Sequence, residues 1–584
     1  VVAVRELDLD GLADNARSWI NDRTVYTHGF GVVAAYGNQR TPSGEPAFFQ
    51  GGIPTTGELE IEQPRVYFGE RSPSFSIVGA PEGAPPRELD YPDDEAPNGQ
   101  RNTTYTGDGG PRMGDPFNRL MYAIKFRDQN ILLSDAVNSE SQILYDRTPR
   151  DRVEKVAPFL TLDGNTYPAV VGGRIVWIID GYTTSDQYPY SSLEPLGELT
   201  IDSLTATSQS VVALRPMEVN YIRNSVKATV DAYDGSVTLY AWDEEDPVLR
   251  AWRKVFPDAV QPMSAIDGEL MSHLRYPEDL FKVQRTVLSS YRVQDPAAFY
   301  SEQDFWRVPN DPTSSEEEPQ PPYYLTLQMP TQDEPAFSLT STYIPRATGQ
   351  NVRNVLTGFL AVDAEAGNAD GERREGYGQL RLLTLPRSSV VNGPGQVQND
   401  FNSNPNVSQS LNVLRLGESQ VISGNLLTLP VGGGMLYVQP VYVQSAGETS
   451  YPLLRRVLVS FGDEIGFADT LDAALDQVFG GDSGAEAGDA GTPGGEEVVP
   501  PVEGEQPPAD GEQPPPTEPG PPAADAQARL QDALNRANQA IQDGQAALAE
   551  SDFAAYGEAQ ERLQQAIQDA LAAEAELRAQ SSQG

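Results

Sequence analysis

The chain has no cysteine and only two histidines among its 584 residues. Thiols and imidazoles carry most nucleophilic, acid–base and transition-metal chemistry in proteins, so mechanisms that need them have few residues to use here. The absence of cysteine also excludes disulfides and thiolate zinc sites. We therefore expect a protein that binds a partner rather than an enzyme, and the sequence leaves catalysis undecided.

Long apolar runs and a surplus of basic residues are missing as well. No stretch reaches the roughly 18 apolar residues of a membrane-spanning helix. With 84 acidic against 41 basic residues the net charge is −43, which repels nucleic acid and excludes it as an expected partner. Because the chain starts at Val1 without methionine, we expect a processed chain or part of a longer one.

Composition divides the chain into three predicted domains, residues 1–479, 480–524 and 525–584. The middle part is rich in Gly, Pro and acidic residues and has no Lys or Arg, which predicts a disordered, extended linker. In the last part, two stripes of Leu, Ile and Ala at steps of three and four are separated at Ser551-Asp552. This pattern predicts an antiparallel helical hairpin that docks on another surface.

The first part, residues 1–479, mixes strand and helix signals and predicts a large, strand-rich α+β domain. Two alternating runs joined by Asp234-Gly235 predict a hairpin over 227–242, and the apolar run at 174–180 predicts a buried strand. Further strands are expected at 64–69, 426–429 and 435–443. Apolar spacing predicts helices over 7–20, 115–126, 246–255 and 277–290. Pro- and Gly-rich segments 81–112 and 310–322 are expected to be surface loops.

One predicted helix places four large apolar residues on a single face. In 115–126, Phe117, Leu120, Met121 and Ile124 recur at the spacing of one helical stripe.

The two histidines are candidate ligand-binding residues. His28 lies in Tyr26-Thr-His-Gly-Phe-Gly31, and His273 lies in His273-Leu-Arg-Tyr-Pro277, which also contains the candidate Arg275. A histidine beside tyrosine in a tight turn is typical of a hydrogen-bonded core residue, and this is the favoured interpretation. The alternative is that both converge on one cleft.

A second group of candidates follows the apolar strand at 174–180. Asp180 is expected to close this strand and to present a carboxylate beside Tyr182 after a Gly turn, and strand ends of this kind often line ligand sites. Tyr188 and Tyr190 offer a surface for stacking on a sugar or a peptide. The alternative is a turn packed by tyrosines.

No cofactor is predicted, and metal binding stays open. Acidic clusters at Asp8–Asp10 and Asp363–Glu372 make calcium a possible ligand, although neither matches a full calcium loop and solvated acidic loops are the favoured interpretation.

Several segments together resemble the uncharacterised bacterial membrane protein family UPF0182 over about residues 19–479. They are Tyr26–Gly31, Gln63–Glu70, Ala157–Leu160, Ile178–Thr183, Tyr188–Ser191, Asn220–Lys227, Val230–Gly235, His273–Phe281 and Gly393–Gln396.

The resemblance implies several N-terminal membrane spans, absent here, followed by a large domain on the extracytoplasmic side of the cell membrane. Our leading hypothesis is a non-enzymatic cell-envelope domain that binds an envelope protein or a glycan, lipid or peptide ligand. One alternative is a carboxylate-dependent enzyme on envelope glycans, for which Asp180 and Asp231 are candidates. Another alternative is the substrate-receiving domain of a transporter.

Overall fold

The computed structural model describes residues 1–488 except 97, 331, 348–352, 389, 416–418, 446–450 and 486, together with 529, 536, 539, 562, 565 and 569. The chain divides into a first unit, Val1–Val498, and a second, Val499–Gly584. In the second unit Arg536 Nη1 donates a hydrogen bond to Asp569 Oδ2 at 2.8 Å. Most of the predicted linker and hairpin lies outside the described residues.

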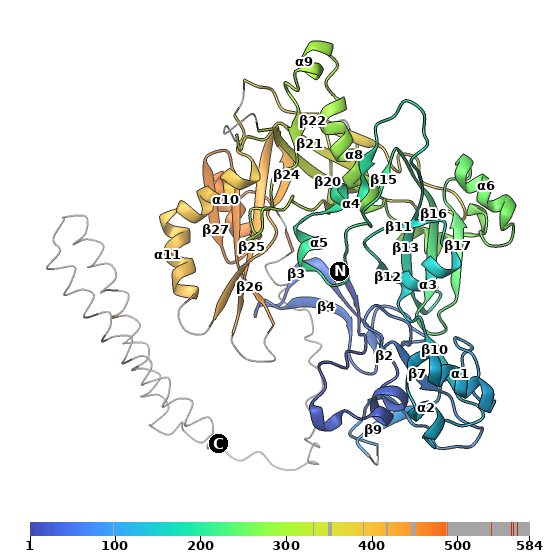
Figure 1. Ribbon diagram of the computed structural model, residues 1–584. Helices are drawn as coiled ribbons and strands as arrows, with labels where there is room; N and C mark the ends of the chain where they lie inside the picture. The colour runs from blue at the N-terminus through green and yellow to red at the C-terminus, as the bar shows by residue number, and fades with distance from the viewer. Residues whose placement is uncertain are drawn as a thin grey trace. The chain divides into compact units, whose positions relative to one another are not determined.

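The first unit combines antiparallel sheets with helices (Figure 1), as the α+β prediction requires. Among its described residues, four sheets have four or five strands. The first contains β1 (Val2–Val4), β3 (Val32–Arg40), β4 (Pro46–Gly51) and β5 (Thr56–Gly57). The second contains β11 (Thr161–Leu162), β12 (Tyr167–Val171), β13 (Arg174–Ser185), β16 (Tyr221–Asp231) and β17 (Val237–Ala241). The third contains β18 (Trp306–Arg307), β19 (Tyr323–Leu327), β20 (Ala336–Pro345), β21 (Gly358–Asp363) and β22 (Leu380–Thr384). The fourth contains β23 (Gln420–Ser423), β24 (Leu427–Val431), β25 (Gly434–Gln444), β26 (Leu453–Phe461) and β27 (Glu464–Ala468).

Shorter strand pairs and helices complete the unit. The pairs are β2 (Gly29–Phe30) with β6 (Arg65–Val66), β7 (Phe75–Val78) with β10 (Gln142–Tyr145), β8 (Glu88–Pro92) with β9 (Gln100–Thr103), and β14 (Glu194–Pro195) with β15 (Glu218–Val219). The helices are α1 (Pro116–Phe126), α2 (Asn130–Leu133), α3 (Pro149–Val156), α4 (Leu196–Thr200), α5 (Ser203–Thr207), α6 (Pro247–Val255), α7 (Gly268–His273), α8 (Glu278–Tyr291), α9 (Pro296–Tyr300), α10 (Pro394–Ser403), α11 (Pro405–Leu414) and α12 (Leu471–Phe479).

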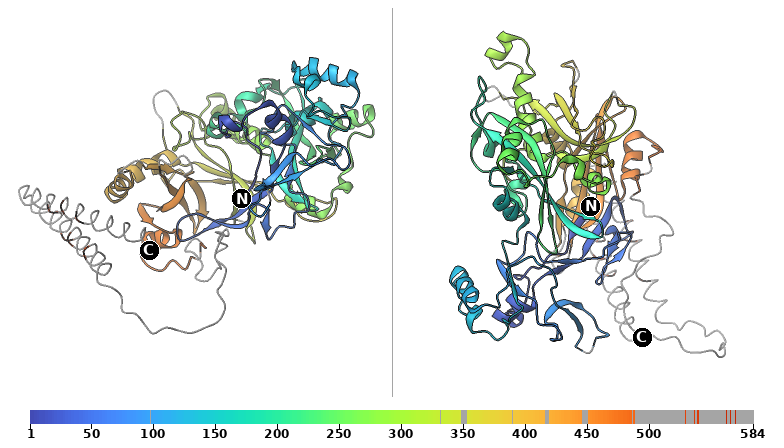
Figure 2. Two further views of the ribbon diagram at one scale, coloured as in Figure 1. Left: turned by 90° about the horizontal axis from the view of Figure 1, so that it is seen from below. Right: turned by 90° about the vertical axis from the view of Figure 1, so that its right-hand side faces the viewer.

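Side-chain alternation lets the fourth sheet bury both of its faces. Along β25, Met435 and Tyr437 belong to the core shared with α10 and α11, whereas Leu436 and Val438 pack with α12. Successive strand residues point to opposite faces, so one strand serves both cores. Figures 1 and 2 show these helices beside the sheet.

The predicted hairpin over 227–242 is confirmed as β16 and β17, which pair from Val226↔Ala241 to Val230↔Val237. Gly235 in its turn has φ +70°, a conformation that glycine adopts without steric cost. The predicted strands at 426–429 and 435–443 and the helices at 115–126, 246–255 and 277–290 are also confirmed within a few residues. The strand predicted at 64–69 is limited to β6.

Two local predictions are wrong. Residues 7–20 do not form a helix; the segment holds a short 3₁₀ turn at Asp14–Ala16, and a π-helical turn follows at Asn21–Val25. Asp8 Oδ1 accepts a hydrogen bond from Asp10 N at 3.0 Å, a local turn that competes with helix formation. Residues 81–112 include the β8–β9 pair, because the buried Glu88 carboxylate fixes this segment by accepting hydrogen bonds from neighbouring backbone.

Candidate functional site

Three of the predicted ligand residues, Asp180, Tyr182 and Arg275, meet in a buried group of charges between β13, β16 and α8. We call it the charge cluster; it comprises Asp163, Asp180, Tyr182, Asp202, Lys227, Arg275, Glu278, Asp279 and Lys282. Asp180 Oδ1 lies 2.5 Å from Lys227 Nζ, and Lys227 Nζ donates to the Arg275 carbonyl at 2.6 Å. The Tyr182 hydroxyl donates to Asp163. The structure therefore brings these three residues together.

The strand that carries Asp180 does not end there, so the predicted strand-end position is wrong. β13 continues to Ser185, with a register shift between Gly181 and Tyr182 opposite β16. A Cβ at Gly181 would lie 3.0 Å from Leu160 Cδ1, so glycine allows this close packing. Asp180 consequently lies in the middle of a strand and is only 2% exposed.

Asp180 and Lys227 form a sealed ion pair. Asn224 Nδ2 donates a further hydrogen bond to Asp180 Oδ1 at 2.9 Å. Burial raises the pKa of Asp180 and lowers the pKa of Lys227, while the opposite charge of each partner opposes both shifts. Because both side chains are removed from water, each needs the other to stay charged.

A second ion group lies along the first turns of α8. Lys282 Nζ lies 2.7 Å from Asp202, 3.0 Å from Glu278 and 3.4 Å from Asp279. Burial lowers the pKa of Lys282, but the three carboxylates outweigh it and raise that pKa overall. Burial and the neighbouring Asp163 raise the pKa of Asp279 well above its ordinary value. The carboxylates thus outnumber the ammonium group that holds them.

Burial makes the charge cluster a structural centre rather than a reaction site. Asp163, Asp202, Lys227, Asp279 and Lys282 are each at most 2% exposed, so a dissolved substrate cannot reach them in the folded chain. The cluster links the second sheet to α8, since the Tyr182 hydroxyl on β13 accepts a hydrogen bond from Leu280 N at 3.2 Å. Asp279 Oδ2 also accepts one from Gly164 N, in the β11–β12 loop, at 2.6 Å.

The alternative carboxylate pair, Asp180 and Asp231, is too widely spaced for glycoside hydrolysis. Asp180 lies opposite Lys227 and Asp231 lies opposite Val176, so the two are four residues apart along paired strands. At about 3.4 Å per residue this is roughly 14 Å along the strands, beyond the roughly 5–10 Å that the reaction needs. Asp231 is already held by Arg174 through bonds of 2.5 and 2.7 Å.

Arg275 lies between two aromatic rings rather than at an open surface. Its guanidinium carbon is 3.9 Å from the Tyr167 ring centroid and 4.4 Å from that of Tyr324. Cation–π contacts of this kind stabilise a cation that has lost its water.

His28 belongs to a different centre, near β6 and β8. Its Nδ1 lies 2.9 Å from Thr27 Oγ1 and its Nε2 lies 3.3 Å from Asp90 Oδ1. Hydroxyl, imidazole and carboxylate in series are the components of a hydrolytic triad. Thr27 is fully buried, however, and its hydroxyl donates to Glu88 Oε2 at 3.1 Å. Arg65 engages both oxygens of Asp90 at 2.7 Å, so this centre is a core hydrogen-bond network.

The remaining predicted residues lie on the surface. His273 is exposed at the end of α7 and shares no hydrogen bond with His28 among the described residues. Tyr188 is exposed and stacks on Tyr221 with ring centroids 5.9 Å apart, and Tyr190 is fully exposed. Both tyrosines are thus accessible, and a stacking role for Tyr188 and Tyr190 stays a prediction.

The two acidic segments considered for calcium carry ion pairs. Asp8 pairs with Arg71 at 3.0 Å, and Asp363 pairs with Arg374. Within the part of the chain that the structure describes, no three or more His, Asp or Glu side chains are grouped so that they could hold a metal ion.

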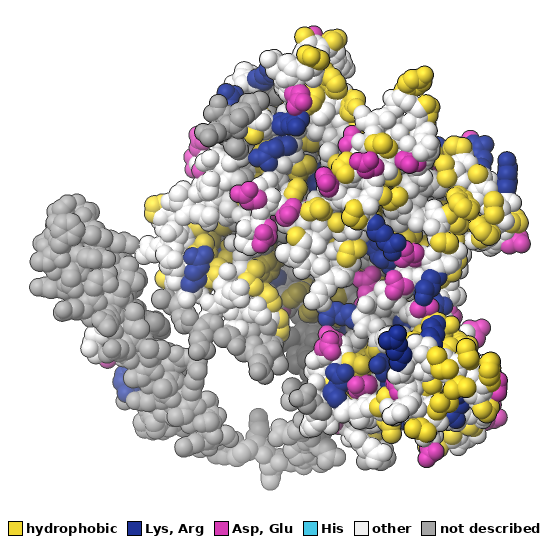
Figure 3. All heavy atoms as spheres, viewed as in Figure 1, with side chains coloured by type: hydrophobic (Ala, Val, Ile, Leu, Met, Phe, Trp, Pro, Cys, Tyr) yellow, Lys and Arg dark blue, Asp and Glu magenta, His cyan; other side chains and the backbone are white. Residues whose placement is uncertain are grey.

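An exposed apolar surface lies on α1 and α2. The stripe of Phe117, Leu120, Met121 and Ile124 faces solvent, with Phe117 64% and Ile124 62% exposed. On the opposite side of α1, Ala123 and Phe126 pack into a core with Phe75 and Ile131. In α2, Leu132 and Leu133 are exposed as well. We call these six exposed residues the α1–α2 surface; Figure 3 shows hydrophobic atoms gathered there.

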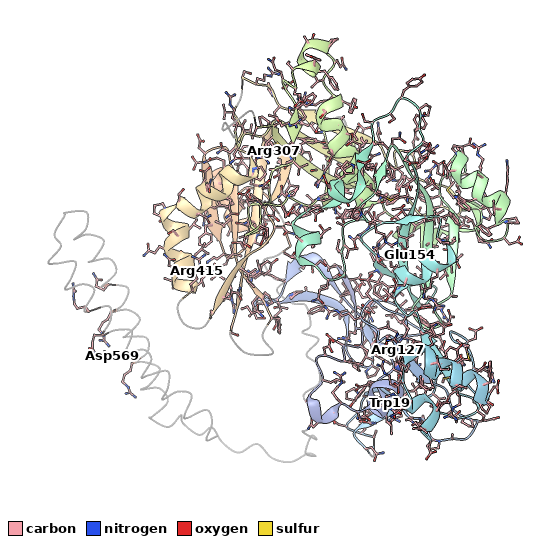
Figure 4. The ribbon with its side chains drawn as sticks, viewed as in Figure 1. Trp19, Arg127, Glu154, Arg307, Arg415 and Asp569 are labelled. Atoms are coloured by element: carbon pink, nitrogen blue, oxygen red, sulfur yellow. The ribbon has the colours of Figure 1, made fainter. Side chains whose placement is uncertain are left out.

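Local geometry fixes the α1–α2 surface firmly. The Asp115 side chain caps α1 by accepting a hydrogen bond from Phe117 N at 3.2 Å, and Arg127 ends the helix with φ 53°. Trp19 Nε1 donates to Asp128 Oδ2 at 2.6 Å, and Figure 4 labels Trp19 and Arg127 beside these helices. The helical stripe was visible in the sequence, but its outward direction was not.

A second apolar face lies on α6. Phe159, Trp252 and Phe256 stack with ring centroids 4.7–6.4 Å apart, and Val255 and Phe256 are exposed. The helix also carries Arg250, Arg253 and Lys254 and no acidic residue.

A hollow of about 580 Å³ beside α9 is lined by Val293, Gln294, Pro296, Phe299, Tyr300, Glu302 and Phe305. None of the predicted site residues lines it. Next to it, Asp304 pairs with both Arg292 and Arg387, at 3.3 and 2.7 Å, so one carboxylate is shared between two cations.

A family model described as an uncharacterised protein family, UPF0182, matches residues 1–414. The chain belongs to the UPF0182 family. A UPF0182 protein of Arthrobacter sp. (strain FB24) is 60% identical over 580 residues, which cover 99% of this chain and 56% of the relative. One of Paenarthrobacter aurescens (strain TC1) is 58% identical over 566 residues, 96% of this chain and 55% of the relative. One of Leifsonia xyli subsp. xyli (strain CTCB07) is 60% identical over 489 residues, 83% and 49% respectively.

This UPF0182 chain spans about half the length of the curated relatives it matches. No solved structure matches it. In the described residues, none of the helices is both long enough and apolar enough to span a membrane.

One carboxyl group of this UPF0182 member titrates near neutrality. Burial, with the neighbouring Glu6 carboxylate, raises the pKa of Glu70 to about 7. Because the pKa is higher in the folded than in the unfolded chain, this group stabilises the fold fully below pH 4.5, the ordinary pKa of glutamate. The stabilisation is lost as the pH rises through 7. Discounted for partial exposure, it amounts to about 1–2 kcal/mol.

We expect Glu70→Gln to remove this pH dependence. Above pH 7 the variant should be more stable than the parent by about 1–2 kcal/mol, and below 4.5 nearly equal to it. Urea unfolding at both pH values measures the difference, and Glu60→Gln, at an exposed position, is the control. Equal changes in the free energy of unfolding for Glu70→Gln and Glu60→Gln would contradict the raised pKa of Glu70.

Proposed function

We propose that this chain is a non-catalytic binding domain of a membrane protein in the bacterial cell envelope, exposed on the extracytoplasmic side. The observation that carries the proposal is the α1–α2 surface, where a full helical stripe of large apolar residues faces solvent. Contiguous exposed apolar surface on a folded domain marks an interaction site, because water contact with it is unfavourable.

The distribution of titratable groups supports binding over catalysis. The charged residues that the sequence suggested for a site, Asp180 and Arg275, are enclosed among partners, and the hydroxyl beside His28 is buried. A reaction centre needs several such groups together within reach of substrate, and of the two histidines, Asp180 and Arg275, His273 alone is exposed. Family membership and the additional length of the relatives are consistent with a domain of a larger protein.

Sidedness is tested with single cysteines, since the chain has none of its own. In the full-length protein in intact cells, Ala297→Cys, at an exposed position of α9, should react with a membrane-impermeant maleimide. Ala241→Cys, fully buried in β17, and the unsubstituted parent are the controls. Labelling of Ala297→Cys only after permeabilisation would contradict the extracytoplasmic placement.

Binding is tested by a photocrosslinking residue at Leu120 in the full-length protein, with Val413 on α11 as the matched exposed position. We expect envelope crosslinks from Leu120 and not from Val413. The competing enzyme hypothesis predicts turnover of cell-wall glycan that an Asp→Asn or Glu→Gln substitution abolishes. That result, without crosslinks from Leu120, would overturn the proposal.

A further inference from the structure

We propose that the α1–α2 surface inserts into the interface of an anionic lipid bilayer, with the α6 face as a second contact. This inference rests on the proposed binding role and names the partner of the same surface. It is carried by the direction of the apolar stripe, by the charges around it and by the placement of the two helices.

The stripe has the form of an interfacial helix. Phe117, Leu120, Met121 and Ile124 stand at i, i+3, i+4 and i+7, so α1 presents an apolar line to solvent over its whole length of about 16 Å. Because α1 also buries Ala123 on its inner side, it is apolar on two faces. A helix with apolar residues on two faces is normally covered on both faces by other apolar groups.

Charge favours an anionic lipid surface over a basic protein partner. The chain carries a net charge of −43, yet α1 has no acidic residue, and the exposed Lys125 and Arg127 stand at its C-terminal end. Arg119 instead donates hydrogen bonds to the backbone carbonyls of Ile131 and Leu132 in α2. An acidic chain approaches anionic lipid only through a patch without carboxylates and with basic residues at its edge. α6 also has no acidic residue within its bounds and carries Arg253 and Lys254 in its last turn next to the exposed Val255. Arg250 and Arg253 pair with Glu245 and Glu244, which precede the helix, so Lys254 is its cation outside these pairs.

The two helices are placed so that one plane can contact both. In the view of Figure 1 and in the view from below in Figure 2, α1 and α6 lie along the same side of the first unit, while α11 lies on the other. In Figure 3 hydrophobic atoms gather over both α1 and α6. Side chains of this kind sink into the acyl boundary while Lys and Arg reach the headgroups.

The test is co-sedimentation of the 584-residue chain with vesicles of equal parts phosphatidylcholine and phosphatidylglycerol, and with vesicles of phosphatidylcholine alone. We expect tighter binding to the anionic vesicles and weaker binding as salt rises. The double variant Phe117→Asp/Ile124→Asp should bind at least about tenfold more weakly, because each large apolar side chain contributes about tenfold or more to partitioning. Val255→Asp on α6 should weaken binding less.

The matched control is Val390→Asp/Val413→Asp, which makes the same charge change at two exposed apolar positions off α1, α2 and α6. It should bind like the parent, and circular dichroism melting should show that all variants fold. Equal binding by the α1 variant and the control would overturn the inference. Failure of the parent chain to bind either kind of vesicle would also overturn it. If Leu120 then crosslinks to a protein or to a second copy of the chain, the proposed binding role stands and only the lipid assignment is lost.

Discussion

Replacing Lys227 with methionine is expected to lower the free energy of unfolding by about 3–5 kcal/mol. The substitution leaves the Asp180 carboxylate buried with no cation, because Lys227 Nζ at 2.5 Å is the group that balances it. Among the residues that the structure describes, Asn224 Nδ2 is then the remaining side-chain donor to that carboxylate. Chemical denaturation of the purified chain measures the loss.

Two controls separate the buried charge from general effects of the substitution. Lys155→Met removes a lysine whose ion pair with Asp146 is 2.5 Å long but whose side chain is 60% exposed, and it should cost about 1 kcal/mol or less. The double variant Asp180→Asn/Lys227→Met should recover much of the lost stability, since no unpaired charge remains. A loss of under about 1 kcal/mol for Lys227→Met would contradict a sealed pair.

Replacing Lys282 with methionine is expected to cost about 3–5 kcal/mol at neutral pH. This side chain balances Asp202, Glu278 and Asp279 within 3.4 Å, so three carboxylates lose their common cation. The pKa of Asp279 is already raised by burial and Asp163, and a raised carboxyl pKa favours the fold at low pH and opposes it as the pH rises.

The loss for Lys282→Met should therefore shrink as the pH falls and the carboxylates take up protons. Unfolding curves of parent, Lys282→Met and Lys155→Met at neutral and acidic pH measure this change. Lys155→Met should show little pH dependence of its small effect. A loss for Lys282→Met that stays constant over this range would mean that its carboxylates do not depend on it.

Local sequence patterns predicted elements whose signals lie within a few residues. The turn at Asp234-Gly235 and its flanking alternation were sufficient for β16 and β17, and Pro277 with two following acidic residues marked the start of α8. The predictions failed where a contact with residues far along the chain, rather than the local sequence pattern, set the structure of a segment. The segment with β8 looked like a loop because its anchor, Glu88, binds backbone at Gly79 and Tyr105, and no local pattern records those partners.

The candidate site was predictable only in part, for the same reason. Asp180, Tyr182 and Arg275 were singled out, and they do lie together, but as members of a sealed cluster. Their decisive partners come from elsewhere in the chain: Lys227 from β16, Asp163 from the loop after β11, and Asp279 from α8. The absence of cysteine and the scarcity of histidine indicated a binding protein from the start, and that remains the proposal.

Sequence by itself determined the composition, the strand-rich α+β character and the helical stripe of Phe117, Leu120, Met121 and Ile124. Only the tertiary structure decided that this stripe faces solvent and that the carboxylate of Asp180 faces Lys227. Periodicity is set by backbone geometry between near neighbours. Which face meets water is set by packing against residues far along the chain, here Phe75 and Ile131 beneath α1.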